Sequence, residues 1–209
     1  MSETLTNKLG HRIGARGGRT RRALLDAVRR LVAERRPGDI RVADVAAAAE
    51  LSPTNFYTYF KHVDEAVLAL CEEAADDFGR LGSHLDGDWS AERGFDAARA
   101  LVLEMLDLWG RHGALLRIEH QLADQGDGRF AECRIRRLRR LHLALERRIA
   151  QARAQGLHPE GLNPRLASYE VASLMESVGA GFQLMRRADT PEAILDTTAW
   201  IVLRLVTGR

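Results

Sequence analysis

Apolar residues recur every three or four positions along most of the chain, which is the spacing of one face of an α-helix. The first stripe predicts a helix over residues 19–36, which Pro37–Gly38 ends. Two short helices are then predicted over residues 42–50 and 52–59. Ser52 is a suitable N-cap for the second of these, and a proline follows it at the first helical position.

The remainder of the chain repeats this pattern in longer segments. Gly110 and Gly113 interrupt one of the stripes, and no stretch alternates apolar and polar residues in the manner of a β-strand. The sequence therefore predicts an all-α protein of about nine helices. The six later helices are expected over residues 64–84, 90–109, 114–123, 130–155, 163–187 and 190–206.

Charge is distributed unevenly along the chain. Residues 1–62 contain twelve Lys or Arg and six Asp or Glu, a net charge of +6, although the whole chain carries only +2. Residues 1–18 are polar, basic and rich in glycine, and we expect them to form a flexible arm. A basic N-terminal part on a mildly acidic remainder indicates a polyanionic partner at the N-terminus.

The segment from Arg41 to Phe60 has the pattern of a helix-turn-helix, in which the second helix enters the major groove of DNA. Asn can read adenine and Thr can contact base edges, whereas Tyr, Arg, Lys and His can bind phosphates. An ordinary helical hairpin with aromatic residues at its surface is the alternative. The predicted DNA-binding residues are Arg41, Ser52, Thr54, Asn55, Tyr57, Thr58, Tyr59, Lys61 and His62.

The same segment resembles the DNA-binding module of the tetracycline-repressor (TetR) family. The matching features are Val-x-x-Val-Ala at 42–46, Leu-Ser at 51–52 and Phe-Tyr-x-Tyr-Phe at 56–60. The resemblance implies a dimeric repressor that leaves a palindromic DNA operator when a small molecule binds its second domain. It also implies a helix-turn-helix domain over residues 19–63 and a ligand-binding and dimerisation domain over residues 64–209.

Three positions depart from the family pattern. Glu50 stands where the family usually has glycine, and a positive φ there would cost about 1 kcal/mol or more. Val63 replaces a common lysine at the start of the fourth helix, which would shift a phosphate contact to Lys61 or His62. Arg41 replaces a common Ser or Thr N-cap, and it is well placed for a phosphate instead.

Large apolar residues and two histidines in the later helices are candidates for a ligand cavity, which the resemblance places in this part of the chain. The alternative for each of them is ordinary core packing. The arginines between Arg134 and Arg148 suggest either a site for an anionic effector, such as an acyl-coenzyme A, or a solvated helix face. The candidate ligand residues are Phe95, Met105, Trp109, Leu116, His120, His142 and Met175.

The last two predicted helices combine small residues with large apolar ones, as helices at a dimer interface do. Two copies would form a four-helix bundle with two-fold symmetry, although packing within one chain is the alternative. The effector that would bind the second domain is expected to be a small, largely apolar molecule. The candidate interface residues are Ser173, Val178, Phe182, Ile194, Thr198, Ile201 and Leu205.

Other function classes find little support in the sequence. It has no metal-binding or nucleotide-binding motif and no nucleophile elbow, so we expect no enzyme, cofactor or metal. The longest apolar runs, such as Ala199–Leu203, are too short for a membrane span. Two cysteines without metal-ligand spacing suit a reduced, cytoplasmic protein. A helical ligand-binding or architectural protein without sequence-specific DNA binding is the remaining alternative.

Overall fold

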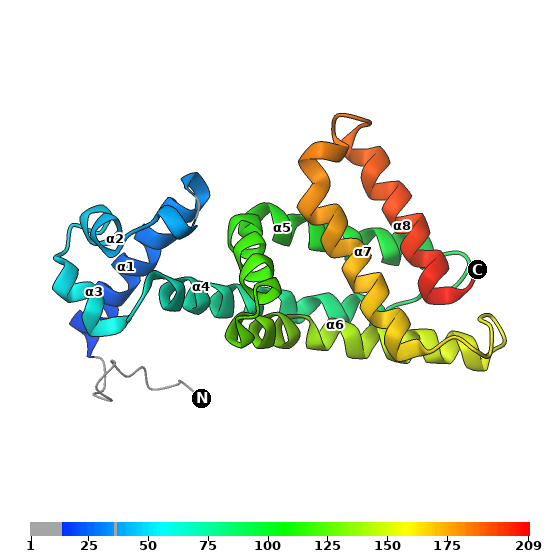
Figure 1. Ribbon diagram of the computed structural model, residues 1–209. Helices are drawn as coiled ribbons and strands as arrows, with labels where there is room; N and C mark the ends of the chain where they lie inside the picture. Colours follow the sequence, from blue (N-terminus) through cyan, green and yellow to red (C-terminus); the bar gives the residue numbers. More distant parts are fainter. Residues whose placement is uncertain (1–13, 36) are drawn as a thin grey trace. The chain divides into compact units, whose positions relative to one another are not determined.

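The computed structural model describes residues 14–35 and 37–209. Throughout these residues the only regular elements are helices, eight of them α-helices, which confirms the predicted all-α class (Figure 1). In chain order these are α1 (Ala15–Glu34), α2 (Val42–Ala48), α3 (Pro53–Tyr59), α4 (Val63–Asp77), α5 (Gly94–Asp124), α6 (Gly128–Ala154), α7 (Pro164–Met185) and α8 (Pro191–Thr207). Two 3₁₀ segments, η1 (Pro37–Asp39) and η2 (Phe78–Asp86), follow α1 and α4.

The helix ends show where local sequence rules succeeded. Asn163 caps α7 by accepting hydrogen bonds from the backbone N–H groups of Arg165 and Leu166. Thr190 caps α8 through the N–H of Ala193. In both helices a proline occupies the first turn, where its missing N–H removes nothing that the helix needs.

Two predictions near the helix ends were wrong. Residues 14–18 do not continue the expected arm, because α1 already begins at Ala15; the other residues of that arm lie outside the described part of the chain. The glycines at 110 and 113 do not break the chain into two helices, since α5 runs through both. A glycine inside a helix costs only about 1 kcal/mol, and the buried residues Trp109 and Leu116 on either side offset it by packing.

The helices form two compact units. The first comprises the described residues up to Glu73 together with Ala114–Cys133. The second comprises Ala74–Gly113 and Arg134–Arg209. The sequence assigned residues 114–133 to the ligand-binding and dimerisation domain, whereas by packing they belong with the N-terminal helices. The functions assigned to the two predicted domains stay predictions.

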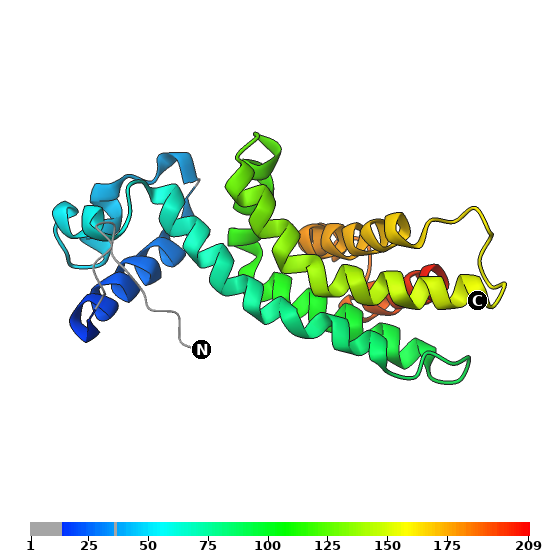
Figure 2. The same ribbon diagram turned by 90° about the horizontal axis from the view of Figure 1, so that it is seen from below.

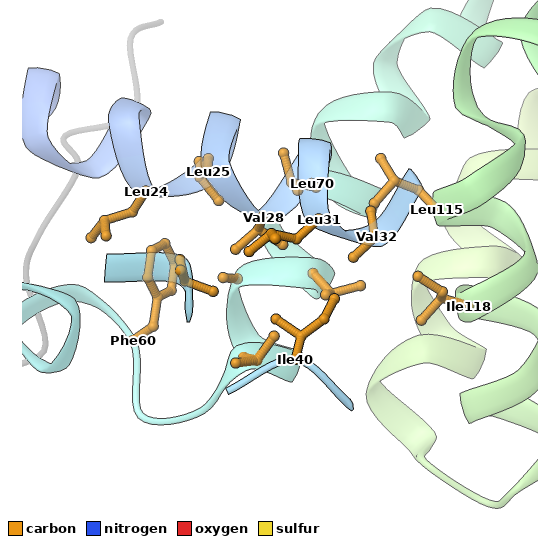
Figure 3. Packing of buried hydrophobic residues seen from close by; sticks show 14 of the residues in the cluster. Leu24, Leu25, Val28, Leu31, Val32, Ile40, Phe60, Leu70, Leu115 and Ile118 are labelled. Carbon is orange, nitrogen blue, oxygen red and sulfur yellow. The ribbon is translucent and has the colours of Figure 1, made fainter. Parts of the chain in front are cut away.

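The first unit is built on one hydrophobic cluster (Figure 3). Leu24, Leu25 and Val28 of α1 point into it, and Phe56 and Phe60 enter from α3 and its end. The cluster continues to Leu70 of α4 and to α5 and α6, which contribute residues such as Leu115 and Phe130. This core holds the short helices α2 and α3, which are too short to be stable alone.

The second unit packs η2 against α6, which lie side by side in Figure 2, and α7 against α8. Gly82 of η2 lies so close to α6 that a Cβ atom there would be 3.0 Å from the carbonyl oxygen of Arg140. No helix in the described ranges has the length and apolarity that crossing a membrane requires.

Candidate nucleic-acid interface

A tight turn joins α2 to α3. Glu50 adopts a φ of 56°, the one positive φ of a non-glycine residue in the described chain. The backbone N–H of Leu51 donates to the carbonyl of Ala46 at 2.9 Å, and Arg30 of α1 donates to the carbonyl of Ala48 at 2.7 Å. Position 50 therefore has the left-handed conformation that would suit the glycine usual in the family. The turn adopts this conformation with glutamate at that position.

The helix after this turn presents its side chains outward. Phe56 is the one fully buried residue of α3, and it anchors the helix to the core. Ser52, Thr54 and Thr58 are exposed, and Tyr57 is 50% exposed. Asn55 is half-buried, and Tyr59 is half-buried against the core. A helix with one buried anchor and an exposed polar face is suited to lie in a groove of DNA.

Short contacts order the outward side chains. The Asn55 side-chain amide donates to the hydroxyl of Ser52 at 3.1 Å, and the Thr58 hydroxyl donates to the carbonyl of Thr54 at 3.2 Å. The ring of Tyr57 stands edge-on to Phe56, with centroids 5.9 Å apart. Ser52 occupies the N-cap position that the sequence predicted, but its hydroxyl bonds to Asn55 and caps no backbone N–H.

Four of the predicted DNA-binding residues meet around one hollow. Arg41, Tyr57, Lys61 and His62 line an open depression of about 520 Å³ at the ends of α2, α3 and α4. The side chains of Arg41, Lys61 and His62 are all exposed there. Three cationic or protonatable groups and a phenol around one depression can donate hydrogen bonds to phosphate oxygens.

The other two departures from the family pattern have local explanations. Arg41 makes no side-chain cap on α2; instead the carboxylate of Asp44 accepts a hydrogen bond from the Arg41 backbone N–H at 2.9 Å. Val63 is buried in the core cluster. Its side chain stabilises the module, while the exposed Lys61 and His62 beside it supply the polar groups.

Comparison with known proteins relates this geometry to a family. The family described as "Tetracyclin repressor-like, C-terminal domain" matches residues 83–209, more than half of the chain. The chain belongs to the tetracycline-repressor-like family. A comparison with curated protein sequences finds no match.

Solved structures of tetracycline-repressor-like fold are similar over nearly the whole chain. NalD of Pseudomonas aeruginosa, described as the secondary repressor of a multidrug efflux pump, has a TM-score of 0.67 and 18% identity, covering 91% of this chain and 98% of that one. FadR of Bacillus subtilis, solved with stearoyl-CoA, has a TM-score of 0.63 and 21% identity over 90% and 98%. AibR, solved with isovaleryl coenzyme A and operator DNA, has a TM-score of 0.62 and 19% identity over 87% and 97%. These likenesses establish the fold.

The predicted ligand residues of this tetracycline-repressor-like chain fall into both units. Leu116 and His120 belong to the first unit. Phe95, Met105, Trp109, His142 and Met175 belong to the second, where Met105, Trp109 and Met175 are buried. Phe95 is half-buried and stacks on the exposed Trp200 of α8, with ring centroids 4.4 Å apart. Phe95 therefore forms an outer aromatic pair with Trp200, which the sequence did not predict.

Helix α6 directs two of its arginines into the second unit. Arg137 is fully buried and donates to the carboxylate of Glu176 at 2.8 Å, and Arg134 donates to it at 3.3 Å. Neither reading of the arginine-rich helix anticipated this role, because Glu176 is distant in sequence. Arg148 donates to the carbonyl oxygens of Leu85 and Gly87, which fixes the end of η2 to α6.

His142, one of the candidate ligand residues, is also a buried residue of α6. Its ring lies against Tyr169 of α7, with centroids 4.0 Å apart. Burial lowers the pKa of His142 below its ordinary value of 6.5; Glu176 opposes this shift, while Arg134 and Arg137 add to it. The imidazole is therefore held neutral at physiological pH.

The predicted interface residues divide by exposure. Val178, Ile194 and Thr198 are already buried inside the protomer. That they contact a partner stays a prediction. Ser173, Ile201 and Leu205 are exposed, and Phe182 is half-buried. Large exposed residues that the sequence analysis missed on these helices are Leu166, Tyr169, Leu184, Met185 and Trp200.

Proposed function

We propose that this protein is a dimeric, ligand-responsive transcriptional repressor that binds a palindromic DNA operator. The observation that carries the proposal is the outward presentation of α3, which is anchored by Phe56 and displays Thr54, Asn55, Tyr57 and Thr58. Membership of the tetracycline-repressor-like family supports it. The AibR complex gives an example of the fold bound to operator DNA.

The contacts to DNA divide by chemistry. Asn55, Thr54 and Thr58 read base edges in the major groove, because amides and hydroxyls can match the donor and acceptor pattern there. The groups around the hollow, and Tyr59 and Ser52 beside them, bind phosphates and set the register of α3 on the duplex. Arg41 and Lys61 contribute charge that is independent of sequence.

Two copies are needed for a palindromic site, since each copy supplies one recognition helix. We propose that the second copy packs against the exposed apolar residues of α7 and α8. Leu184 is 68% exposed and Trp200 54% exposed, and apolar residues at such exposure are stabilised when a partner removes them from water. Ser173, Phe182, Ile201 and Leu205 belong to the same proposed interface.

The effector is a small, largely apolar molecule that binds the second unit beside Met105, Trp109 and Met175. It releases DNA only if it binds more tightly to a conformer in which the two recognition helices are wrongly spaced. FadR and AibR are each solved with an acyl-coenzyme A, so this class is the first to test. We propose that the protein acts on DNA in the cytoplasm and that it catalyses no reaction.

Selection from a random duplex library with the full-length protein tests the proposal. We expect a palindromic sequence to be enriched and bound far more tightly than mixed-sequence DNA, with strong salt dependence. The triple variant Asn55→Ala, Tyr57→Ala, Lys61→Ala should lose this binding while its circular dichroism stays unchanged. Equal binding of every duplex would favour an architectural role, and normal operator binding by the folded triple variant would show that α3 is not the recognition helix.

A further inference from the structure

Three arginines of α1 converge on one carboxylate of α4. Glu73 accepts a hydrogen bond from Arg22 at 2.9 Å and lies 3.5 Å from the guanidinium of Arg29. Arg21 lies 3.8 Å from the other carboxylate oxygen. Arg22 and Arg29 are two helical turns apart, so Glu73 bridges the N-terminal half of α1 along its length. The group carries a net charge of +2.

Two of these ion pairs, those of Arg22 and Arg29, are open to solvent, whereas the Arg21 side chain is only 20% exposed. Arg22 is 55% exposed and Arg29 49% exposed, whereas the carboxylate of Glu73 is 31% exposed. Ion pairs at such exposure are weak, and a competing anion can exchange with the carboxylate. A DNA phosphate is such an anion, and guanidinium groups bind it with two parallel hydrogen bonds.

One of the three arginines lies beside the proposed DNA-binding surface. The guanidinium of Arg21 sits over the ring of Phe60, 5.4 Å from its centroid. Phe60 immediately follows α3 and precedes Lys61, whose side chain lines the hollow described above. Arg21 therefore lies next to groups that we assign to phosphate binding.

We propose that Glu73 limits the sequence-independent affinity for DNA: it occupies arginines of α1 that would otherwise bind phosphates. This inference rests on the proposed function. Phosphate contacts strengthen binding to every duplex alike, whereas base contacts discriminate between sequences. An internal carboxylate that competes with phosphates for the same arginines lowers the sequence-independent part of the affinity and leaves the base contacts of α3 unchanged.

The test compares Glu73→Gln with the unchanged full-length protein on two duplexes, the selected operator and a mixed-sequence duplex of equal length. We expect Glu73→Gln to bind the mixed-sequence duplex more tightly, by about threefold or more at low salt. The slope of log K against log salt should steepen by about 0.9, the contribution of one added phosphate contact. The affinity for the operator should rise by a similar factor, because the added phosphate contact carries no sequence information.

Asp76→Asn is the matched control, because it removes the same charge from an exposed position of α4 one turn away. It should change the slope less than Glu73→Gln does. Glu73→Asp keeps the charge but shortens the side chain, so it should shift mixed-sequence binding in the same direction by a smaller factor. It also serves as the test if thermal unfolding shows that Glu73→Gln does not fold.

The outcomes separate this inference from the proposed function. The role of Glu73 would be overturned, and the proposed function kept, by either of two results. One is operator binding by the folded Glu73 variants with an unchanged slope of log K against log salt. The other is an equal effect of Glu73→Gln and Asp76→Asn. Weaker mixed-sequence binding by Glu73→Gln would overturn the role of Glu73 as well. A wild-type protein that binds no duplex would overturn the proposed function and this inference with it.

Discussion

The side-chain amide of Asn55 donates a hydrogen bond to the hydroxyl of Ser52 across one turn of α3, at 3.1 Å. This bond uses one of the two N–H donors of the amide and leaves the other donor and the carbonyl oxygen available. Those two remaining groups are the pair that recognises adenine in the major groove. Asn55 can therefore read a base while Ser52 fixes its rotamer before DNA arrives.

Asn55→Ala should reduce the preference for the operator over a duplex changed at the recognised base, by about 1–3 kcal/mol. Binding to mixed-sequence DNA should stay nearly constant, because the phosphate contacts remain. Titrations of the two duplexes at one salt concentration measure the ratio. Ser52→Ala is the control: it keeps the amide and removes its acceptor, so its effect should be smaller. An unchanged ratio in Asn55→Ala would exclude Asn55 from base readout.

The turn before α3 holds Glu50 in a left-handed conformation, with a φ of 56°. Such a conformation costs an L-residue about 1–2 kcal/mol, and the greater freedom of glycine in the unfolded chain offsets part of any gain. Glu50→Gly should therefore raise the free energy of unfolding by about 1 kcal/mol in urea titrations. Glu50→Ala retains a Cβ atom and should give no such gain; equal stabilities of the two variants would contradict the strain at this position.

The helix-turn-helix could be predicted from the sequence because its determinants are local. The stripes of α1 and α2, the proline at the start of α3 and the anchor Phe56 all act within a few residues. Even the strained turn at Glu50 could be anticipated, since the pattern requires a residue there with a positive φ. The helix count was close for the same reason, as most helix ends carry a cap or a proline.

What the sequence missed depends on residues that are far apart in the chain. The pairing of Arg137 with Glu176 joins helices 39 positions apart, and no local pattern identifies such a partner. The continuity of α5 through its glycines likewise depends on packing. For Val178 and Ile194, periodicity identified an apolar face but not whether it packs within the chain or against a partner.

His142 should make stability depend on pH. Burial lowers its pKa from 6.5 in the folded protein, so over the interval below 6.5 the unfolded chain binds a proton that the folded chain does not. Its contribution to stability is therefore fully present above 6.5 and is lost as the pH falls through the folded pKa. Tyr169 stacks on the ring, while Glu176 opposes the shift and Arg134 and Arg137 support it.

Urea unfolding at about pH 7.5 and about pH 5.5 measures this dependence. His142→Leu removes the titrating group, so the difference in unfolding free energy between the two pH values should shrink. The exposed His62 provides the control, and His62→Gln should retain the wild-type difference. A His142→Leu variant with the full wild-type difference would assign the pH dependence to other groups.

Gly179 of α7 touches the indole of Trp109, and a Cβ atom there would lie 2.4 Å from the ring carbons Cγ and Cδ1. Trp109 is buried and cannot move aside, so Gly179→Ala should lower the free energy of unfolding by about 1–3 kcal/mol. Gly110 is the matched control, because a Cβ atom there meets nothing within 4 Å.

Gly110→Ala should raise the free energy of unfolding by up to about 1 kcal/mol, since alanine is the better helix former. Urea titrations of the two variants under one condition measure both signs. Stabilisation by both substitutions would show that α5 and α7 separate readily at Trp109. Opposite signs would instead establish that the contact between α7 and the Trp109 indole requires glycine at position 179.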